Sequence, residues 1–146
     1  MIIDTHAHIH QHDEHEIPEI ISRALECNVS KIITAGVNIT DSKLSLKIAN
    51  KYENVYSGVG IHPEEIKSPI SKNDINALKS LSKENKVKVI SEIGLDNQNT
   101  SPDIKIQEEG FYEQIKLAKE EKFSKLIKTI YLAEVPERLI FLLTMQ

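Results

Sequence analysis

Four short apolar runs that alternate with helical patterns are the feature that most restricts the fold of this chain. Each run contains isoleucine or valine, and together they cover residues 1–9, 31–36, 55–60 and 87–94. Between them, apolar residues recur at the three- and four-residue spacing of an amphipathic helix, as in Ile17, Ile20 and Ala24. A strand followed by a helix about every 30 residues predicts parallel strands joined by helical crossovers. We therefore expect an α/β fold, either an arc of a βα-barrel or an open sheet.

Local signals add detail to this pattern. The run at residues 1–9 is predicted to be a buried strand. Asp41 or Ser42 can serve as the N-cap of the second helix, and Ser101 as the N-cap of the last one. Gly110 lies inside that last helix, where it costs about 1 kcal/mol relative to alanine. The chain is therefore predicted to contain four successive strand–helix units.

Composition limits the class of protein to which the chain can belong. Its 146 residues are 40% hydrophobic, which is enough for the core of one ordinary domain. A formal charge of −4 gives no broad cationic field, so a phosphate ligand would need a bound metal or a few lysines. One cysteine, Cys27, excludes an internal disulfide. Without a signal-peptide pattern or an apolar run long enough for a bilayer, we expect a cytoplasmic protein with no membrane partner.

Residues that suit metal chemistry fall at the carboxyl ends of the predicted strands. His6 and His8 end the first run, His62 follows the third, and Glu92 lies in the fourth. Strand side chains alternate between faces, so His6 and His8 point the same way and can share one cation. A carboxylate in an apolar strand must be paired or bind a metal, so Glu92 is either a ligand or the partner of a lysine. In a βα-barrel this end of the strands carries the chemistry.

Other polar residues near this edge have open roles. His62 could contact substrate or pack in its loop, and Asp96 could orient a metal ligand or cap a turn. The His-x-His spacing alone is weak evidence, because two polar residues at a strand end are not unusual. His10, His12 and His15 lie in a polar loop without periodicity, where we expect solvated side chains. Contact with substrate or phosphate at a barrel mouth is the alternative for these three histidines.

Four sequence blocks taken together resemble one known family. The blocks are Ile3-Asp4-Thr5-His6-Ala7-His8, Gly60-Ile61-His62-Pro63, Ser91-Glu92-Ile93-Gly94-Leu95-Asp96, and Gln107-Glu108-Glu109 through Phe111 to Leu117-Ala118-Lys119-Glu120. Their order and spacing are similar to those of the TatD family of metal-dependent deoxyribonucleases, within the amidohydrolase-like TIM barrels. The resemblance covers residues 1–121.

This resemblance implies an eight-stranded barrel with one or two divalent metal ions, Mg, Zn or Mn, at its mouth. In the family, residues matching His6 and His8 bind one metal. The residue matching Glu92 is a ligand that bridges two bound metals, which makes Glu92 the candidate catalytic residue. Residues matching His62 and Asp96 line the site. The implied reaction is hydrolysis of phosphodiester bonds, chiefly in DNA, by hydroxide that the metal generates near neutral pH.

The sequence departs from the family pattern after residue 121. No histidine follows His62 and no aspartate follows Asp103. The family's later histidine ligands, and the aspartate assigned to activating water, therefore have no counterpart. We expect about the first four of the eight βα units of a TIM barrel at residues 1–121, and a divergent apolar or helical tail at residues 122–146. A frameshift or premature stop would give such an abrupt change.

The predicted tail has an ambiguous pattern. Residues 123–131 are spaced like one more helix, whereas a strand over residues 122–130 would preserve the alternation. Residues 139–143 fit a strand or a helix end. Four strands alone cannot close a barrel, so exposed sheet edges and an exposed inner face would favour self-association.

Three functions are compatible with these residues. The first is a TatD-like metal-dependent hydrolase that acts on DNA and is impaired by the missing ligands. The second is a truncated metal-binding remnant without catalysis. The third is another amidohydrolase-like metal hydrolase, acting on amides or lactones. The pair His6 and His8 is common to that superfamily, whereas the block from Glu92 to Asp96 favours the phosphodiesterase branch.

Overall fold

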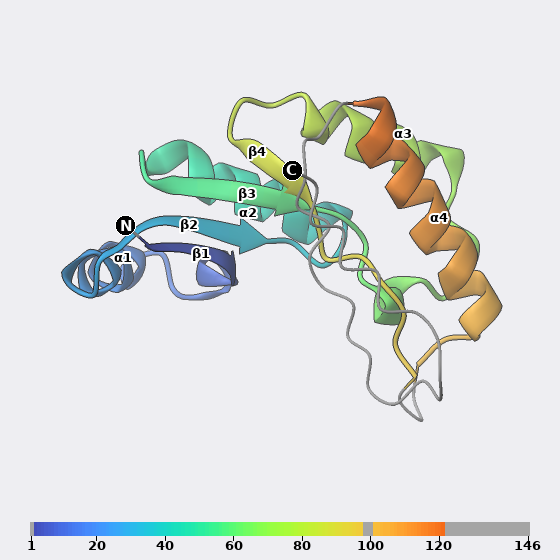
Figure 1. The fold of residues 1–146 in the computed structure, drawn as a ribbon, viewed down its shortest axis with the longest axis horizontal. Helices are drawn as coiled ribbons and strands as arrows, with labels where there is room; N and C mark the ends of the chain where they lie inside the picture. Colours follow the sequence, from blue (N-terminus) through green and yellow to red (C-terminus); the bar gives the residue numbers. More distant parts are fainter. Residues whose placement is uncertain (1, 98–100, 122–146) are drawn as a thin grey trace.

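One parallel β-sheet carries the fold of residues 2–97 and 101–121, which the computed structural model describes. Its strands are β1 at Ile2–Ala7, β2 at Val29–Ala35, β3 at Val55–Val59 and β4 at Val87–Ile90. They lie side by side in the order β1-β2-β3-β4, and each described pair of neighbours is parallel (Figure 1). The predicted parallel sheet is therefore confirmed.

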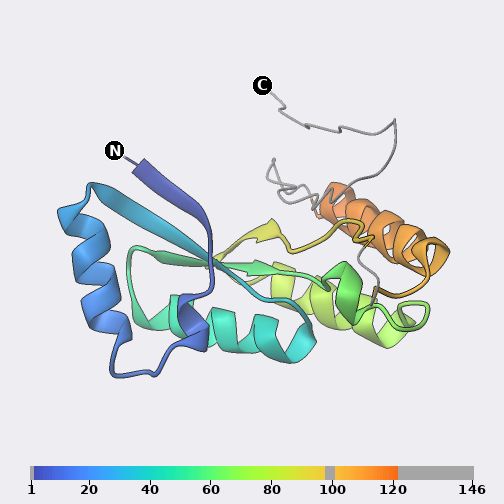
Figure 2. The same cartoon turned by 90° about the horizontal axis from the view of Figure 1, so that it is seen from below.

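A helix follows each strand along the chain. The helices are α1 at Ile17–Glu26, α2 at Ile39–Lys51, α3 at Lys72–Ser82 and α4 at Ile104–Glu120, with short 3-10 helices η1 at Ile9–Gln11 and η2 at Pro63–Glu65. Figure 2 shows α1, α2 and α3 on one face of the sheet. A doubly wound sheet reverses its strand order, whereas this order is sequential. The arrangement is that of an arc of a βα-barrel.

Two apolar clusters hold the helices against the strands. One joins α1 to β2 and includes Ile17 and Ile32. The other joins α3 and α4 to β4 and includes Leu78, Ile90 and Leu117. Burying one such side chain contributes about 1.5–3 kcal/mol. The helices therefore cover the strands through the apolar positions whose spacing predicted them.

The prediction that residues 1–9 form a buried strand is wrong for the start of β1. Ile2 is 54% exposed and Ile3 is 44% exposed. The reason is the sheet order, because β1 lies at one edge of the described sheet and pairs with β2 alone. Strand side chains project above and below the sheet, and among the described residues α1 packs against β2 and leaves the start of β1 uncovered.

Two predicted helix starts are wrong by a few residues. The N-cap of α2 is Asn38, whose side chain accepts from the amide of Asp41, so neither Asp41 nor Ser42 is the cap. The N-cap of α4 is Asp103 and not Ser101. In both helices the side chain of the N-cap residue accepts a hydrogen bond from a backbone amide of the first turn, two or three residues further on. That amide would otherwise have no partner within the helix. Several residues in each segment could do this, and the loop geometry selects one.

Gly110 lies inside α4 as predicted, and close packing explains its presence. A Cβ atom at this position would lie 2.7 Å from Cδ1 of Ile66 and 3.0 Å from Cδ1 of Ile70. The glycine therefore lets α4 approach the segment after η2 more closely than any other residue would.

The predictions for the tail lie outside the described residues. These are the helix at 123–131 or strand at 122–130, the segment at 139–143, and the boundary between residues 121 and 122. Within the described part of the chain, no helix combines the length and the apolar character needed to cross a bilayer.

Candidate metal centre

The carboxyl end of β1 is irregular where it presents its histidines. Asp4 lies opposite Ile32 of β2 and Ala7 lies opposite Thr34, so the register shifts between these two pairs. Inside this stretch the amide of His6 donates to Oδ1 of Asp4 at 3.0 Å. Irregular pairing of this kind turns side chains toward functional sites. His6 is therefore positioned by a local irregularity in strand pairing as well as by strand alternation.

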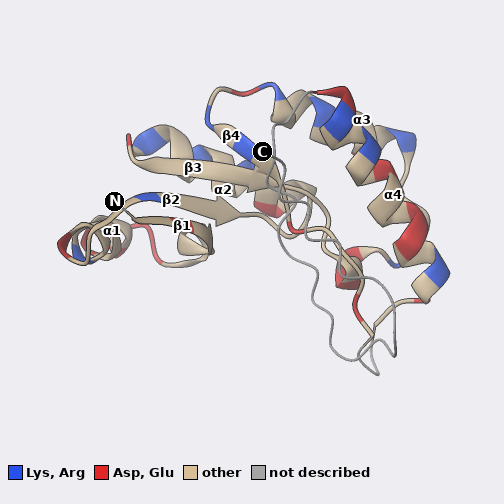
Figure 3. Cartoon of the chain, in the orientation of Figure 1, with Lys and Arg blue, Asp and Glu red and all other residues tan. Residues whose placement is uncertain are grey.

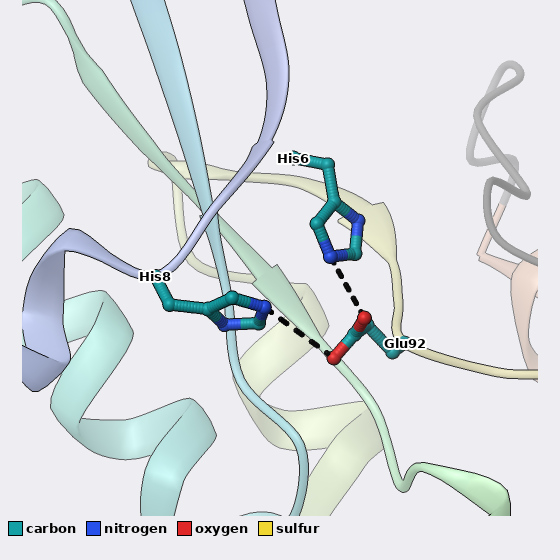
Figure 4. Close-up of side chains that lie close together, drawn as sticks. All are labelled: His6, His8 and Glu92. Carbon is teal, nitrogen blue, oxygen red and sulfur yellow. Dashed lines mark ion pairs between the residues drawn. The ribbon is translucent and has the colours of Figure 1, made fainter.

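His6, His8 and Glu92 converge at the carboxyl edge of the sheet (Figure 4). Oε1 of Glu92 lies 2.7 Å from Nε2 of His6, and Oε2 lies 3.7 Å from Nε2 of His8. One donor atom from each of the three residues lies within 4.8 Å of the other two. The histidine rings meet edge to face with centroids 5.1 Å apart. Two imidazole nitrogens and a carboxylate arranged in this way can hold a divalent cation.

Glu92 reaches the histidines from the opposite edge of the described sheet. β4 ends before it, so the strand is shorter than the predicted run at 87–94. The amide of Ser91 donates to the oxygen of Val59 at 3.0 Å, and the amide of Glu92 donates to the oxygen of Gly36 at 3.3 Å. These bonds carry the segment across the ends of β3 and β2 toward β1. The three side chains therefore join the two edges of the sheet.

The carboxylate of Glu92 is buried, with the residue only 5% exposed. Among the described residues its ion-pair partners are His6 and His8, and the lysine pair considered from the sequence does not occur there. A buried carboxylate without partners is strongly unfavourable. The two histidines, or a cation bound between the three side chains, compensate the negative charge of this buried carboxylate.

The orientation of His8 is fixed by the backbone of β2. Nδ1 of His8 lies 2.8 Å from the oxygen of Ala35. A carbonyl oxygen can only accept, so Nδ1 carries a proton and Nε2 is the ring nitrogen left to bind a metal. This is the tautomer that binds a metal through Nε2, with the other ring nitrogen held by a hydrogen bond.

His62 and Asp96 lie on loops beyond the neighbouring strands. Nδ1 of His62 accepts from the amide of Glu64 at 3.3 Å, which caps η2. Asp96 is 3% exposed, and its backbone amide donates to the side chain of Gln107 at 2.7 Å. In the described part of the chain, the metal-donor cluster consists of His6, His8 and Glu92 and includes neither of these residues.

Two glutamines that hold the site loops received no role from the sequence. Gln107 contacts the backbone of Asp96, and Gln114 contacts the backbone of Ile61. Both glutamines are fully buried. The available signal was their position on the same stripe of the helix as Ala118, where a polar side chain requires a partner.

The expectation that His10 is solvated is wrong, whereas His12 and His15 are exposed as expected. His10 is 3% exposed, with Nδ1 at 2.5 Å from Oγ1 of Thr34. Its Nε2 lies 3.0 Å from Oδ2 of Asp41, close enough for an ion pair although the geometry does not meet that of a hydrogen bond. The reason is that η1 folds this segment back over β2 and α2. A fold-back of this kind leaves no periodic pattern in the sequence, so it could not be predicted.

Asp41 is held in its ionised form beside His10. Burial by itself raises the pKa of Asp41, but the amide of Val37 and the ring of His10 together lower the pKa below its usual value. The amide of Val37 donates to Oδ2 of Asp41 at 2.9 Å. The turn after β2 is therefore tied to α2 and to the segment that follows the metal-donor histidines.

Sequentially wound βα units with two histidines and a glutamate at their carboxyl edge define part of a βα-barrel that carries a metal-donor cluster. The chain belongs to the TatD related DNase family, whose model matches residues 3–127. It is 34% identical over 122 residues to the uncharacterized metal-dependent hydrolase YabD of Bacillus subtilis, covering 82% of this chain and 47% of YabD. It is 36% identical over 110 residues to the 3'-5' ssDNA/RNA exonuclease TatD of Cronobacter sakazakii, covering 73% of this chain and 40% of that protein.

Solved structures of the family have the same fold over the matched part. The TatD homolog YJJV of Escherichia coli superposes with a TM-score of 0.72 at 28% identity, covering 84% of this chain and 48% of that one. A TatD family hydrolase of Entamoeba histolytica gives a TM-score of 0.69 at 25% identity, and the match covers 82% of this chain and 46% of that one. The chain thus spans about half the length of the relatives it matches. The fold class is a partial TIM barrel.

Proposed function

We propose that this chain carries the divalent-metal centre of a TatD-like hydrolase that acts on the phosphodiester bonds of nucleic acid. The observation that carries the proposal is the convergence of His6, His8 and Glu92 at the carboxyl edge of the sheet, in a chain of this family. This edge is where βα-barrel enzymes place their chemistry.

The chemistry of the three donors fits a divalent cation. His8 presents Nε2 toward Glu92, because Nδ1 is engaged by the oxygen of Ala35. The carboxylate of Glu92 is buried and faces both imidazoles. Imidazole nitrogens suit zinc, whereas carboxylate oxygens suit magnesium and manganese, so each of these three is a candidate. Relatives named metal-dependent hydrolases support a resident cation.

The proposed mechanism assigns a separate task to each residue of the chain. His6, His8 and Glu92 hold the cation, which when bound supplies water of lowered pKa and neutralises phosphate charge. Because Nδ1 of His62 accepts from the amide of Glu64, its Nε2 carries a proton that it can donate to a phosphate oxygen. Asp96 is proposed to line the site from the loop beyond β4.

The proposed substrate is single-stranded DNA or RNA with a free 3' end. Relatives named 3'-5' ssDNA/RNA exonucleases support this choice. Lysines and acidic residues are interspersed over α3 and α4 rather than separated by sign (Figure 3). With a formal charge of −4, the chain has little general attraction for phosphates, so recognition would depend on the metal centre.

Metal binding without hydrolysis is the second candidate function. It is favoured by the small donor set, since the one cluster found among the described residues has three members. A hydrolytic site needs ligands that hold the cation and a separate group that handles the proton of the attacking water.

One experiment on the purified chain separates these functions. Binding of Zn²⁺, Mn²⁺ and Mg²⁺ is measured by calorimetry, and hydrolysis of single-stranded DNA and RNA labelled at either end is followed beside Glu92→Gln. Metal-dependent loss of 3'-terminal nucleotides that Glu92→Gln abolishes supports the hydrolase. Bound metal without cleavage supports the second candidate. Cleavage that survives Glu92→Gln would refute the proposed centre, and turnover of amides or lactones alone would indicate another branch of metal hydrolase.

A further inference from the structure

The buried stripe of α4 is unusual because two of its members are glutamines. Its five residues are Gln107, Gly110, Gln114, Leu117 and Ala118. A helix that served only to cover the sheet would bury apolar side chains along such a stripe. A buried carboxamide is costly unless its oxygen and its nitrogen are both hydrogen-bonded. The partners of these glutamines therefore indicate what the stripe does.

Each glutamine side chain binds both the amide and the carbonyl of one loop residue. The amide of Ile61 donates to Oε1 of Gln114 at 2.7 Å, and Nε2 of Gln114 donates to the oxygen of Ile61 at 3.0 Å. The amide of Asp96 donates to Oε1 of Gln107 at 2.7 Å, and Nε2 of Gln107 donates to the oxygen of Asp96 at 2.9 Å. We call these two pairs of bonds the carboxamide clamps. Each replaces the hydrogen bonds that a neighbouring strand would make.

The clamped residues lie where the site loops leave the sheet. Ile61 follows β3 and directly precedes His62, whereas Asp96 follows β4 and Glu92. Gln107 also donates from Nε2 to the oxygen of Pro102 at 2.6 Å, which ties the start of α4 to the same loop. Of the two candidate residues outside the metal-donor cluster, α4 thus holds Asp96 directly and His62 through the residue before it, Ile61.

One rigid helix sets the spacing of both loops. Gln107 and Gln114 are seven residues apart, which places them on one face and about 10 Å apart along the axis. Gly110 lies between them and gives the side chain of Ile66 room to pack against the helix. Leu117 and Ala118 anchor the same face in the apolar cluster. The positions of the two loops relative to each other therefore follow from the geometry of α4.

We infer that Gln107 and Gln114 are positioning residues, which set Asp96 and His62 relative to each other through α4 and independently of the metal-donor cluster. Their link to substrate rests on the proposed function, whereas the clamps themselves do not. The loops that carry His62 and Asp96 are then held in place by α4, whereas the metal-donor cluster is held by the strands. Both parts lie at the same edge of the sheet.

Hydrogen exchange on the full chain tests the clamps directly. Gln114→Met keeps the side-chain volume but removes one clamp, and Gln107→Met removes the other. Gln114→Met should speed amide exchange in residues 59–66 about tenfold or more while residues 93–97 change little, and Gln107→Met should do the reverse. Leu117→Val is the control, because it loosens the packing of α4 without touching either clamp. Equal loss of protection in both loops for each variant, or no loss in either, would overturn the inference.

A second variant keeps the test decisive if the methionine variants fail to fold. Protonated glutamate in Gln114→Glu has an acceptor oxygen and a donor hydroxyl, so it can reproduce the clamp, whereas the carboxylate cannot donate to Ile61. Relative to the unsubstituted chain at each pH, residues 59–66 should lose protection as pH rises. Protection of residues 59–66 that differs from that of the unsubstituted chain by the same factor at every pH would contradict the role of Gln114.

The functional link has its own readout. Gln114→Met should leave Zn²⁺ affinity within about twofold, because the three donors are untouched, and weaken binding of a phosphorothioate oligothymidylate about tenfold. If Gln114→Met weakened binding of Zn²⁺ and of the oligonucleotide to the same extent, the clamps would not act independently of the metal-donor cluster. A chain that binds no oligonucleotide without substitution would refute the proposed function, while hydrogen exchange would still decide the carboxamide clamps.

Discussion

Nδ1 of His8 lies 2.8 Å from the backbone oxygen of Ala35, so the end of β2 sets the orientation of the imidazole that directly follows β1. A backbone acceptor cannot be removed by substitution of its own side chain. It also fixes the tautomer before any cation arrives. The His8 ligand of the metal-donor cluster is therefore already oriented for binding by the pairing of β1 with β2.

Replacing Glu92 with glutamine should remove most of the divalent-metal affinity. Loss of a hydrogen-bond partner behind a ligand already costs about 10- to 100-fold, so loss of the carboxylate itself should cost at least as much. Calorimetric titration with Zn²⁺ measures the effect. Glu109→Gln on the exposed face of α4 is the matched control. Unchanged affinity in Glu92→Gln would place the metal elsewhere.

Removing the hydroxyl that faces His10 should destabilise the fold. Thr34→Val keeps the shape of the side chain but leaves Nδ1 of a buried imidazole without its partner. The free energy of unfolding in urea should fall by about 1–3 kcal/mol. Thr40→Val makes the same chemical change at an exposed position of α2. Equal effects of the two substitutions would mean that the contact contributes nothing.

The carboxyl group of Asp41 should make stability depend on pH in the acid range. Its folded pKa is lowered, so its contribution is complete above the unfolded pKa of about 4 and is lost as pH falls through the folded pKa. Asp41→Asn removes this contribution. The difference in unfolding free energy between the two proteins should shrink as pH falls from 7 toward 3. Parallel pH curves from urea unfolding would contradict the role of this carboxylate.

Substituting Gly110 with alanine should destabilise the chain even though alanine is the better helix former. The gain of about 1 kcal/mol in helix propensity opposes an overpacking cost of about 1–3 kcal/mol against Ile66. Adding Ile66→Val removes the Cδ1 atom that the new methyl group would meet. The double variant should recover stability relative to the sum of the single changes, as urea unfolding would measure. Additive losses would mean that this contact is not the constraint.

The exposed edge of β1 should promote self-association. Ile2 and Ile3 are open to solvent on β1, which has no strand on its outer side among the described residues. The mass from light scattering should rise with protein concentration, and Ile3→Lys should reduce this rise. Leu25→Lys on the exposed side of α1 is the control. A monomeric mass at every concentration would rule out association through this edge.

The sequence predicted the sheet and the meeting of three donors because both follow from periodicity. Carboxyl ends of parallel strands share one edge, so His6 and Glu92 could be expected near each other despite their separation in sequence. The burial of His10 could not be predicted in this way, since η1 has no period and its contacts depend on where a turn folds back. The exposure of Ile3 depends on which strand the neighbouring helix leaves uncovered. Neither property is local to the residue concerned.

The carboxamide clamps of α4 could not be predicted from the sequence for a different reason. Apolar residues such as Leu117 and Ala118 mark the buried face of α4, but a pattern of apolar residues gives no role to a glutamine within it. The backbone that Gln114 binds belongs to a loop more than one strand–helix unit away. Only the positions of both elements in space make the partnership visible.

The joining of the two sheet edges by His6, His8 and Glu92 has a consequence for the order of folding. The donors come from the first and the last of the four units, so the cluster cannot exist until every intervening strand has taken its place. Such long-range contacts form late because chain closure over many residues must come first. The rate of cation uptake during refolding would therefore report when the sheet is complete. A bound ion would stabilise all four strand–helix units together.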